Sequence, residues 1–484
     1  MTDLVGGTVE RRSGPPELRP ITVDEAMRLA IERLRLDQPR DAEVLLRRVL
    51  EVAPDHPDAL HYLGMLAHKD GRGDEAVALM RRSLELAPDQ ADWHSNLGIV
   101  LQARDDLEEA MHCFARAIEL QPSHANAHNN LGVLLRVFRR HDEAEAAYRQ
   151  AIAIDPFHAD AYHNLAIVLD LTGRMREAVI AYSRALTLKP EYPEIRRVLA
   201  LAYCAIGERD KAVTLCEAWV ADEPDDPAAR HTLAAVSGQD VPLRADDAYV
   251  QRVFDGFSTT FEAKLARLEY RAPELVVHAL AASGLRADGT LDVLDAGCGT
   301  GLCAPGLAPY AKRLVGVDLS SGMLRHAAEK KRYDDLVQGE LTSYLQQHPG
   351  SFDIIVSADT LVYFGALEDV ARAAARGLRP AGVLVFTVEE WDDGGAEEAA
   401  QSSAGASADT GYCLRPHGRY SHRAGYVERL LREAGLEVQI DRDQLRKEQG
   451  LPVPGLIVQA RKPRSARHDD SHTPGRPDVG EPHA

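Results

Sequence analysis

The apolar residues in the first half of the chain recur at helical spacing within a unit of constant length. Two stretches in each unit carry apolar residues three and four positions apart, which predicts a pair of amphipathic helices. Small residues such as Gly98 and Ala110 occupy fixed places, where they allow the two helices to approach each other. A proline closes each unit, and six of these prolines stand 34 residues apart: Pro54, Pro88, Pro122, Pro156, Pro190 and Pro224. The pattern predicts an all-α array over 23–236, with six units to about residue 226 and a degenerate seventh at 228–236 as a cap.

A different pattern follows the sequence Ser237-Gly238-Gln239-Asp240-Val241-Pro242, which breaks the 34-residue period. Its glycine, proline and polar residues predict a linker at 237–247. Beyond the linker, short apolar runs alternate with helical stretches, and this alternation predicts a seven-stranded α/β domain over 248–463 whose first five strands form a parallel sheet. The predicted strands lie near 291–296, 312–318, 334–338, 352–358, 381–388, 436–441 and 455–461, and a helix is predicted at about 423–434.

Three segments lack both patterns. The ends of the chain, 1–22 and 464–484, are polar and are predicted to be disordered. Residues 396–409 are rich in Ala, Ser and Glu and interrupt the alternation after the fifth predicted strand. We predict that these residues form a mobile loop or a lid over the active site.

Composition narrows the classes of partner and compartment. The 484 residues include 75 acidic and 56 basic side chains, so the net charge of −19 opposes non-specific attraction to nucleic acid and to anionic lipid. We therefore expect no nucleic acid, and a basic or neutral partner. The six cysteines include no C-x-x-C pair and no metal-type spacing with histidine, which predicts reduced thiols and no metal. Because the chain has no signal-type apolar region and no run of about 18 apolar residues, we expect a cytoplasmic protein without a membrane span.

The segment Val293-Leu294-Asp295-Ala296-Gly297-Cys298-Gly299-Thr300-Gly301 has the character of a nucleotide site. An apolar strand ends in an acid, and three glycines at alternate positions then let the backbone turn where a side chain would collide with a ligand. A second strand ends in Asp318, 21 positions after Gly297, where a carboxylate can accept hydrogen bonds from both ribose hydroxyls. The chief alternative, a dinucleotide site, requires G-x-G-x-x-G, whereas this segment is G-x-G-x-G. An acid two residues before the first glycine suits an ammonium group and not a phosphate, which favours a methyl donor over a nicotinamide.

Residues 245–463 therefore resemble class I S-adenosylmethionine-dependent methyltransferases, and the array is similar to tetratricopeptide repeats. The pairing is similar to that of bacterial predicted methyltransferases that carry such repeats. The resemblance implies a tetratricopeptide superhelix followed by a Rossmann-like methyltransferase domain, with S-adenosylmethionine as donor and S-adenosylhomocysteine as product. Phe254-Asp255-Gly256-Phe257 and Phe261 resemble the leading helices that cover the cofactor in this family; the alternative is ordinary amphipathic packing.

The resemblance also implies a role for each residue on the cofactor side. The acid of the first strand would lie near the methionine amino group, the glycines would form the floor beneath the ligand, and the acid of the second strand would hold the ribose. Residues after the second and third strands would contact the adenine, with Glu340 at a position where the family often has Asp. The expected cofactor-binding residues are Asp295, Gly297, Gly299, Gly301, Asp318, Leu319, Met323, Glu340 and Leu341.

The acceptor side is less defined by the sequence. Methyl transfer from a sulfonium is an in-line displacement, so the protein must mainly align the acceptor and exclude water, and a base is needed only for an acceptor that loses its proton early. The candidates at the carboxyl ends of strands are Asp359, Thr360 and Tyr363, and, after the Ala/Ser-rich loop, His417, Tyr420 and His422. Each has a plainer interpretation as a helix cap, a core residue or an ordinary surface group. Ala358-Asp359-Thr360-Leu361 replaces the Asn/Asp-Pro-Pro-Tyr motif of amino-methylating relatives, which weakens the case for an adenine or glutamine amide as acceptor.

Asn96, Asn130 and Asn164 occupy the same position in three successive repeats. Such a row resembles the asparagine ladder of O-linked N-acetylglucosamine transferase repeats, in which carboxamides hold an extended peptide backbone with one donor and one acceptor each. The alternative is a consensus residue with a role inside its own helix. The first interpretation predicts a groove for a protein or peptide partner.

Three functions remain open at the level of the sequence. The first is a methyltransferase whose array recruits a protein or peptide partner or substrate. The second is a methyltransferase that modifies an O, N or C atom of a small metabolite and uses the array for assembly. The third is a scaffold that binds S-adenosylmethionine or S-adenosylhomocysteine without turnover.

Overall fold

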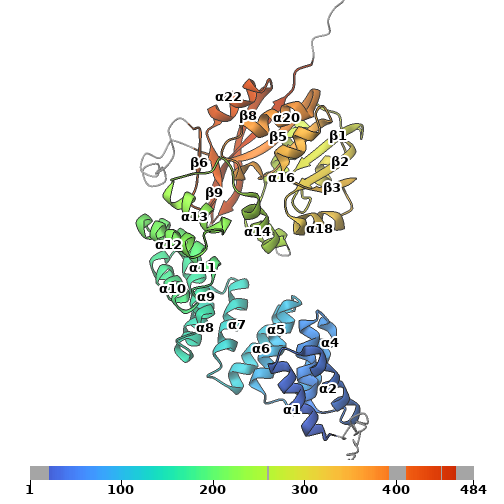
Figure 1. Ribbon diagram of the computed structural model, residues 1–484, viewed down its shortest axis with the longest axis vertical. Helices are drawn as coiled ribbons and strands as arrows, with labels where there is room; N and C mark the ends of the chain where they lie inside the picture. Colours follow the sequence, from blue (N-terminus) through green and yellow to red (C-terminus); the bar gives the residue numbers. More distant parts are fainter. Residues whose placement is uncertain (1–20, 259–260, 392–409, 449, 465–484) are drawn as a thin grey trace, which may run out of the picture. The chain divides into compact units, whose positions relative to one another are not determined.

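The computed structural model describes residues 21–258, 261–391, 410–448 and 450–464 (Figure 1). The loop or lid predicted at 396–409 and nearly all of the disorder predicted at 1–22 and 464–484 lie outside these residues. The chain divides into two compact units, 1–195 and 196–484. The division falls inside one helix of the array, so the last helices of the array belong to the unit that contains the sheet. The linker predicted at 237–247 lies within that second unit.

The first unit is a series of helical hairpins, as predicted from the 34-residue period. Its helices alternate between 13 and 14 residues from α1 to α10. They are α1 (Val23–Arg35), α2 (Pro39–Val52), α3 (Pro57–Lys69), α4 (Gly73–Leu86), α5 (Ala91–Ala103), α6 (Leu107–Leu120), α7 (Ala125–Val137), α8 (His141–Ile154), α9 (Ala159–Leu171), α10 (Met175–Leu188) and α11 (Pro193–Ala205), which crosses into the second unit.

The small residues of each repeat lie where its two helices meet. A Cβ added to Gly98 of α5 would lie 2.7 Å from a ring carbon of Phe114 in α6, and one added to Gly132 of α7 would lie 2.6 Å from the ring of Tyr148 in α8. Phe114 and Tyr148 are themselves fully buried. The glycine of one helix therefore receives the aromatic ring of the next, and this packing explains why the pattern repeats without insertion.

The second unit contains an α/β sheet. Its helices are α12 (Arg209–Asp222), α13 (Pro227–Ser237), α14 (Asp247–Phe257), α15 (Phe261–Arg267), α16 (Ala272–Ala282), α17 (Ala304–Leu307), α18 (Ser321–Glu329), α19 (Leu341–Gln347), α20 (Glu368–Gly377), α22 (Ala424–Glu433) and the short 3-10 helix η2 (Leu361–Tyr363). Its strands are β1 (Leu291–Ala296), β2 (Ala311–Asp318), β3 (Asp335–Gln338), β4 (Phe352–Ser357), β5 (Leu378–Glu390), β6 (Tyr412–Leu414), β7 (Tyr420–His422), β8 (Glu437–Glu448) and β9 (Leu451–Arg461).

The sheet contains the seven predicted strands and two short additional ones. Strands β3, β2, β1, β4 and β5 lie side by side in parallel, and β9 pairs antiparallel with β5 and with β8. The additional strands β6 and β7 form a hairpin, and β7 pairs with the end of β5. The order reverses between β1 and β4, and in open α/β sheets ligands bind beyond the carboxyl ends of the strands at this point.

Helices cover both faces of the sheet (Figure 1). On one face α19, α20 and α22 bury a core that includes Leu345, Ala374 and Leu430 against Ile355 and Phe386. On the other face α16 and α17 pack their apolar residues against β1, β4 and β5. The all-α array followed by a Rossmann-like α/β domain is therefore confirmed.

Candidate functional site

The glycine loop, residues 297–301, begins directly after β1. Gly297, Gly299 and Gly301 have φ angles of 78°, 53° and 84°, in the left-handed region that residues with a Cβ rarely adopt. A Cβ on Gly297 would lie 2.1 Å from Oγ1 of Thr360, whereas one on Gly299 would meet no atom within 4 Å. Thr360 also donates a hydrogen bond to the Gly297 carbonyl at 3.2 Å. The loop is thus fixed against the segment after β4 on one side and open at Gly299, as a cradle for a ligand requires.

The acid that ends β2 is bonded to this loop. One oxygen of Asp318 accepts from the Gly299 N–H at 2.9 Å, and the other accepts from the Ser320 N–H at 2.8 Å. Burial raises the pKa of Asp318. Each carboxylate oxygen has a second lone pair, so the carboxylate can accept further hydrogen bonds such as those from two ribose hydroxyls.

The acid that ends β1 is enclosed. Asp295 is 1% exposed, and it accepts a hydrogen bond of 2.7 Å from the hydroxyl of Tyr333. Burial raises the pKa of Asp295 to about 7. Tyr333 was not anticipated from the sequence, because it lies in the connection between α18 and β3 and belongs to no recognisable motif.

The residues expected on the adenine side lie in two places. Met323 is buried in the first turn of α18, directly beyond β2. Glu340 caps α19 and accepts from the N–H groups of Thr342 and Ser343, while Leu341 packs into the apolar core. Leu319 is half-buried between β2 and α18. Their predicted contacts with adenine remain predictions.

Two helices before the sheet contact the cofactor side. Asp255 of α14 accepts from the Ser320 hydroxyl at 2.5 Å and from the Gly322 N–H at 3.2 Å. Glu262 of α15 accepts from the Thr300 hydroxyl at 2.7 Å. These contacts place α14 and α15 beside the glycine loop and the start of α18, where the family resemblance expects the leading helices.

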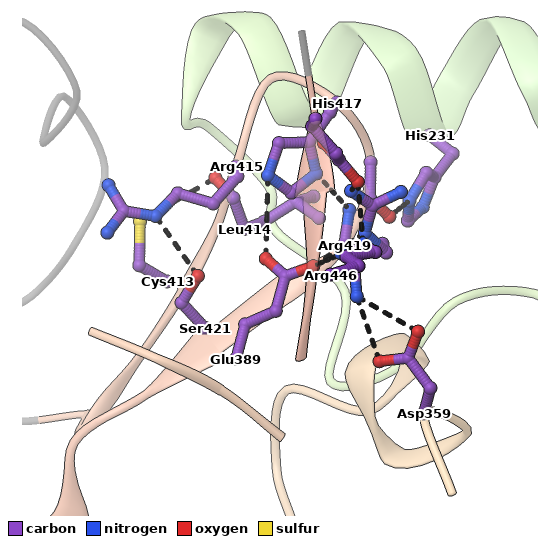
Figure 2. A network of polar contacts seen from close by, with 12 residues as sticks. His231, Asp359, Glu389, Cys413, Leu414, Arg415, His417, Arg419, Ser421 and Arg446 are labelled. Atoms are coloured by element: carbon purple, nitrogen blue, oxygen red, sulfur yellow. Dashed lines mark hydrogen bonds and ion pairs between the residues drawn. The ribbon is translucent and has the colours of Figure 1, made fainter. Parts of the chain in front are cut away.

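On the acceptor side, Asp359 follows β4 in a strained conformation. Its φ of 56° lies in the left-handed region, which for a non-glycine residue costs about 1–3 kcal/mol and is typical of functional sites. Its N–H donates to Oγ1 of Thr387 at 2.9 Å, and burial raises the pKa of its carboxyl. Both carboxylate oxygens accept from Nη1 of Arg446, at 3.1 and 2.9 Å (Figure 2).

Arg446 is the centre of a buried group of charges, which we call the charged network. Its side chain is 3% exposed and contacts three carboxylates, those of Asp359, Glu389 and Glu448. Figure 2 shows Arg446 of β8 and Arg419 of the turn between β6 and β7 converging on Glu389. The charged network comprises Asp359, Glu389, His417, Arg419, Arg446 and Glu448.

The pKa values of Glu389 and His417 are both lowered in this network. Burial alone would raise the pKa of Glu389, but His417, Arg419 and Arg446 lower it to about 2. The Nε2 atom of His417 lies 3.5 Å from Glu389, and burial lowers the histidine pKa to about 4. At neutral pH the carboxylate is therefore charged and the imidazole is neutral.

The six acceptor-side candidates lie in different surroundings. Asp359 and His417 belong to the charged network. Thr360 contacts the glycine loop, and Tyr363 is half-buried, with its ring 5.6 Å from that of Phe254. The other two are fully buried: Nε2 of His422 contacts the Gly365 carbonyl at 3.0 Å, and the Tyr420 hydroxyl donates to the Pro242 carbonyl at 2.7 Å.

Several members of the network were missed by sequence reasoning. Glu389 comes from β5, Arg419 from the turn between β6 and β7, and Arg446 and Glu448 from β8, so no single local spacing relates the group. One signal was present at Glu389, because this acid ends an apolar strand as Asp295 and Asp318 do. No comparable sequence pattern distinguishes Arg419 and Arg446 from the other arginines.

In the first unit, the row of asparagines makes contacts between repeats. Nδ2 of Asn96 lies 3.1 Å from Nε2 of His61, and Asn164 donates to Oδ1 of Asn129 at 2.9 Å. Asn130 accepts from Asn129 at 3.2 Å. All three residues of the row are half-buried; Asn96 and Asn164 join neighbouring repeats, whereas the hydrogen bond of Asn130 stays within its own helix.

Among the described residues, none of the helices is both long and apolar enough to cross a membrane. The same part of the chain contains no group of three or more His, Cys, Asp or Glu side chains placed to hold a metal ion.

Known families match both halves of the chain. The family described as "Methyltransferase domain" matches residues 294–386, and families described as "Tetratricopeptide repeat" match 55–123, 95–159, 134–193 and 173–236. A ubiquinone biosynthesis O-methyltransferase of Thiobacillus denitrificans is 29% identical over 157 residues, which cover 30% of this chain and 65% of that protein. The protein of the same description from Albidiferax ferrireducens is 33% identical over 103 residues, 20% of this chain and 40% of that protein. The chain thus spans less than two thirds of the length of these relatives.

Solved structures resemble the helical part. That of Pseudomonas aeruginosa pilF has a TM-score of 0.40 and 18% sequence identity, and the match covers 44% of this chain and 96% of that chain.

Proposed function

We propose that this chain, which carries a methyltransferase domain joined to tetratricopeptide repeats, transfers a methyl group from S-adenosylmethionine to a substrate that the repeats recruit. The observation that carries the proposal is the arrangement of two acids around an open glycine loop. Asp318 is bonded to the loop at Gly299, where the structure leaves open space, and Asp295 lies enclosed at the end of the adjacent strand.

The residues present fit this donor. Asp295 would pair with its ammonium group, Asp318 would hold its ribose, and the open position at Gly299 would admit it without collision. When bound, S-adenosylmethionine supplies an electrophilic methyl group on a sulfonium. The contacts of Asp255 and Glu262 bring α14 and α15 to the same place, where they would exclude water.

The charged network would serve the acceptor. Asp359 follows β4, and Glu389 is the penultimate residue of β5, so both lie at the carboxyl edge of the sheet, where ligands bind in open α/β folds. Since burial raises the pKa of Asp359, its carboxylate is a better proton acceptor than an exposed aspartate and would take the proton of an acceptor hydroxyl. Arg446 fixes both oxygens of that carboxylate. Its role is therefore to orient Asp359.

A second candidate is methylation of a small molecule. Two similar proteins favour this alternative, since their names describe an O-methyltransferase of ubiquinone biosynthesis, and ubiquinone is a small molecule. The repeats would then serve assembly. Both candidates use the same donor site and differ only in the acceptor.

One experiment separates these functions. The full chain is incubated with methyl-labelled S-adenosylmethionine and bacterial extract, and label is measured in the protein and low-mass fractions. Label in a protein band supports recruitment of a protein substrate, and label in the low-mass fraction supports the small-molecule alternative. If neither fraction gains label above an enzyme-free control while S-adenosylmethionine still binds, the chain is a binding scaffold.

The row of asparagines supplies a test of recruitment. We expect replacement of Asn96, Asn130 and Asn164 with alanine to lower protein labelling roughly tenfold or more at limiting extract, because each amide contributes about 0.5–1.5 kcal/mol. Affinity for S-adenosylmethionine, measured by calorimetry, should not change.

The matched control is Asn126→Ala. Asn126 accepts from His158 of the next repeat at 3.0 Å but lies outside the row, so this variant removes one inter-repeat contact without removing the row. Equal labelling by the triple variant and the wild type would refute the role of the asparagines in binding.

A further inference from the structure

The segment that follows the repeats is built into the acceptor side of the second unit. The Ala245 N–H donates to the Tyr363 carbonyl at 2.8 Å. The N–H groups of Gly365 and Ala366 donate to the Leu243 carbonyl at 2.9 and 2.8 Å. These three hydrogen bonds join the segment after α13 to the loop after β4, the same loop that carries Asp359.

The last repeat helix contacts a second acceptor-side element, the hairpin formed by β6 and β7. His231 of α13 is 4% exposed, and its Nε2 donates to the Gly418 carbonyl at 2.8 Å. A carbonyl only accepts, so this nitrogen carries the proton. The ring also stacks on Tyr249 of α14 at 4.2 Å, which fixes its orientation. Ala234 and Ala235 of α13 pack against Leu414 and Tyr420 of the hairpin.

The bonded carbonyl lies between the two residues of the hairpin that enter the charged network. His417 precedes Gly418 and contacts Glu389, and Arg419 follows it and pairs with Glu389 at 2.6 Å (Figure 2). Gly418 has a φ of 90°, and a Cβ there would lie 2.8 Å from the Tyr249 hydroxyl. The backbone conformation of the turn is therefore restricted by its contacts with α13 and α14 on one side and with Glu389 on the other.

We propose that His231 is a positioning residue for the acceptor side: through the Gly418 carbonyl, the last repeat helix fixes the turn that places His417 and Arg419 against Glu389. This inference rests on the proposed methyltransferase function. The donor-side acids are on β1 and β2 and do not contact the hairpin. Loss of the His231 bond therefore changes the use of the acceptor and leaves binding of the donor intact.

The test compares three variants of the full chain in the extract-labelling assay. His231→Ala removes the hydrogen bond, and His231→Gln keeps a side-chain N–H that can donate to the same carbonyl. His348→Ala is a matched control: His348 stacks on Tyr344 at 4.2 Å, and its Nδ1 donates to a backbone carbonyl at 2.8 Å, but it lies before β4, away from the acceptor-side loops.

We expect His231→Ala to raise the amount of extract acceptor needed for half-saturation by roughly threefold to tenfold, the range for loss of one hydrogen bond. The dissociation constant for S-adenosylmethionine should stay at the wild-type value. His231→Gln should recover most of the loss, and His348→Ala should behave as the wild type. If His231 only supported the fold, its loss would weaken both binding of S-adenosylmethionine and use of the acceptor. His231→Gln would then not restore the use of the acceptor.

Four results would overturn the inference. If His231→Ala needs the same amount of acceptor as the wild type, the inference is rejected and the proposed function stands. The same conclusion follows if His231→Gln or His348→Ala shows a defect as large as that of His231→Ala. Absence of transfer by the wild-type chain rejects the proposed function and the inference with it. The wild-type measurement therefore distinguishes failure of the inference from failure of the proposed function.

Discussion

Replacing Asp295 with alanine is expected to abolish detectable methyl transfer and to weaken binding of S-adenosylmethionine by roughly 10- to 100-fold, since a hydrogen bond to a charged group contributes about 1.5–3 kcal/mol. The donor's ammonium group would lose its partner, and the Tyr333 hydroxyl would lose the carboxylate to which it donates at 2.7 Å. Calorimetric titration with S-adenosylmethionine measures the affinity, and the labelling assay measures the transfer.

The wild-type affinity should also depend on pH. The pKa of Asp295 is raised to about 7, so the group is protonated and neutral below that value and becomes a carboxylate above it. Only the carboxylate pairs strongly with an ammonium group, so affinity should rise between about pH 6 and pH 8. This rise should be absent in Asp295→Ala.

Asp292→Ala is the control for position within the same strand. Asp292 lies at the other end of β1 and pairs with Arg379 at 2.7 Å. This variant should keep the wild-type affinity and its pH dependence. Transfer that persists in Asp295→Ala would show that the donor site has been placed wrongly.

Replacing Arg446 with methionine is expected to destabilise the second unit by about 3–5 kcal/mol, the cost of removing one partner from a buried ion pair. Glu389 is 3% exposed and would keep Arg419 as a cationic partner, while Asp359 would lose both hydrogen bonds to its carboxylate. Urea unfolding in a Trp93→Phe background measures the loss, because the remaining tryptophans, Trp219 and Trp391, both lie in the second unit.

Arg442→Met provides the comparison on the same strand. Arg442 is 61% exposed and pairs with Glu390 at 2.7 Å, so its removal should cost no more than about 1 kcal/mol. The double variant Arg446→Met, Asp359→Asn should recover part of the loss, since it removes the buried charge that Arg446→Met leaves without its hydrogen-bond partner. Equal destabilisation by Arg442→Met and Arg446→Met would contradict the central role given to Arg446.

The repeat helices and the central strands were predictable because their signals are local. Each repeat buries its apolar residues against its neighbours, so the glycine and aromatic positions recur every 34 residues and are visible without a structure. Strands β1, β2, β4 and β5 contain runs of buried residues that appear as continuous apolar runs in the sequence. The glycine loop was visible for the same reason, since residues 295–301 lie next to one another in the sequence.

The remaining elements depend on tertiary contacts. Strand β8 was expected at 436–441 but runs to Glu448. Its second half was not predicted because it is mostly polar, and part of it belongs to the charged network. Strands β6 and β7 have three residues each, too few for an alternating pattern to be recognised. Arg446 and Asp359 are 87 residues apart, so their pairing left no mark in the sequence.

The hydrogen bond between His231 and Gly418 spans 187 residues, and this separation has a consequence for the order of folding. During synthesis the hairpins of the first unit can pack as soon as their neighbours emerge, because their contacts are local in sequence. Helix α13 is made soon afterwards, but Ala234 and Ala235 remain uncovered until Leu414 and Tyr420 have also been made. The last repeat must therefore wait, with an exposed apolar surface open to chaperones or to aggregation, until the sheet beyond it is nearly complete.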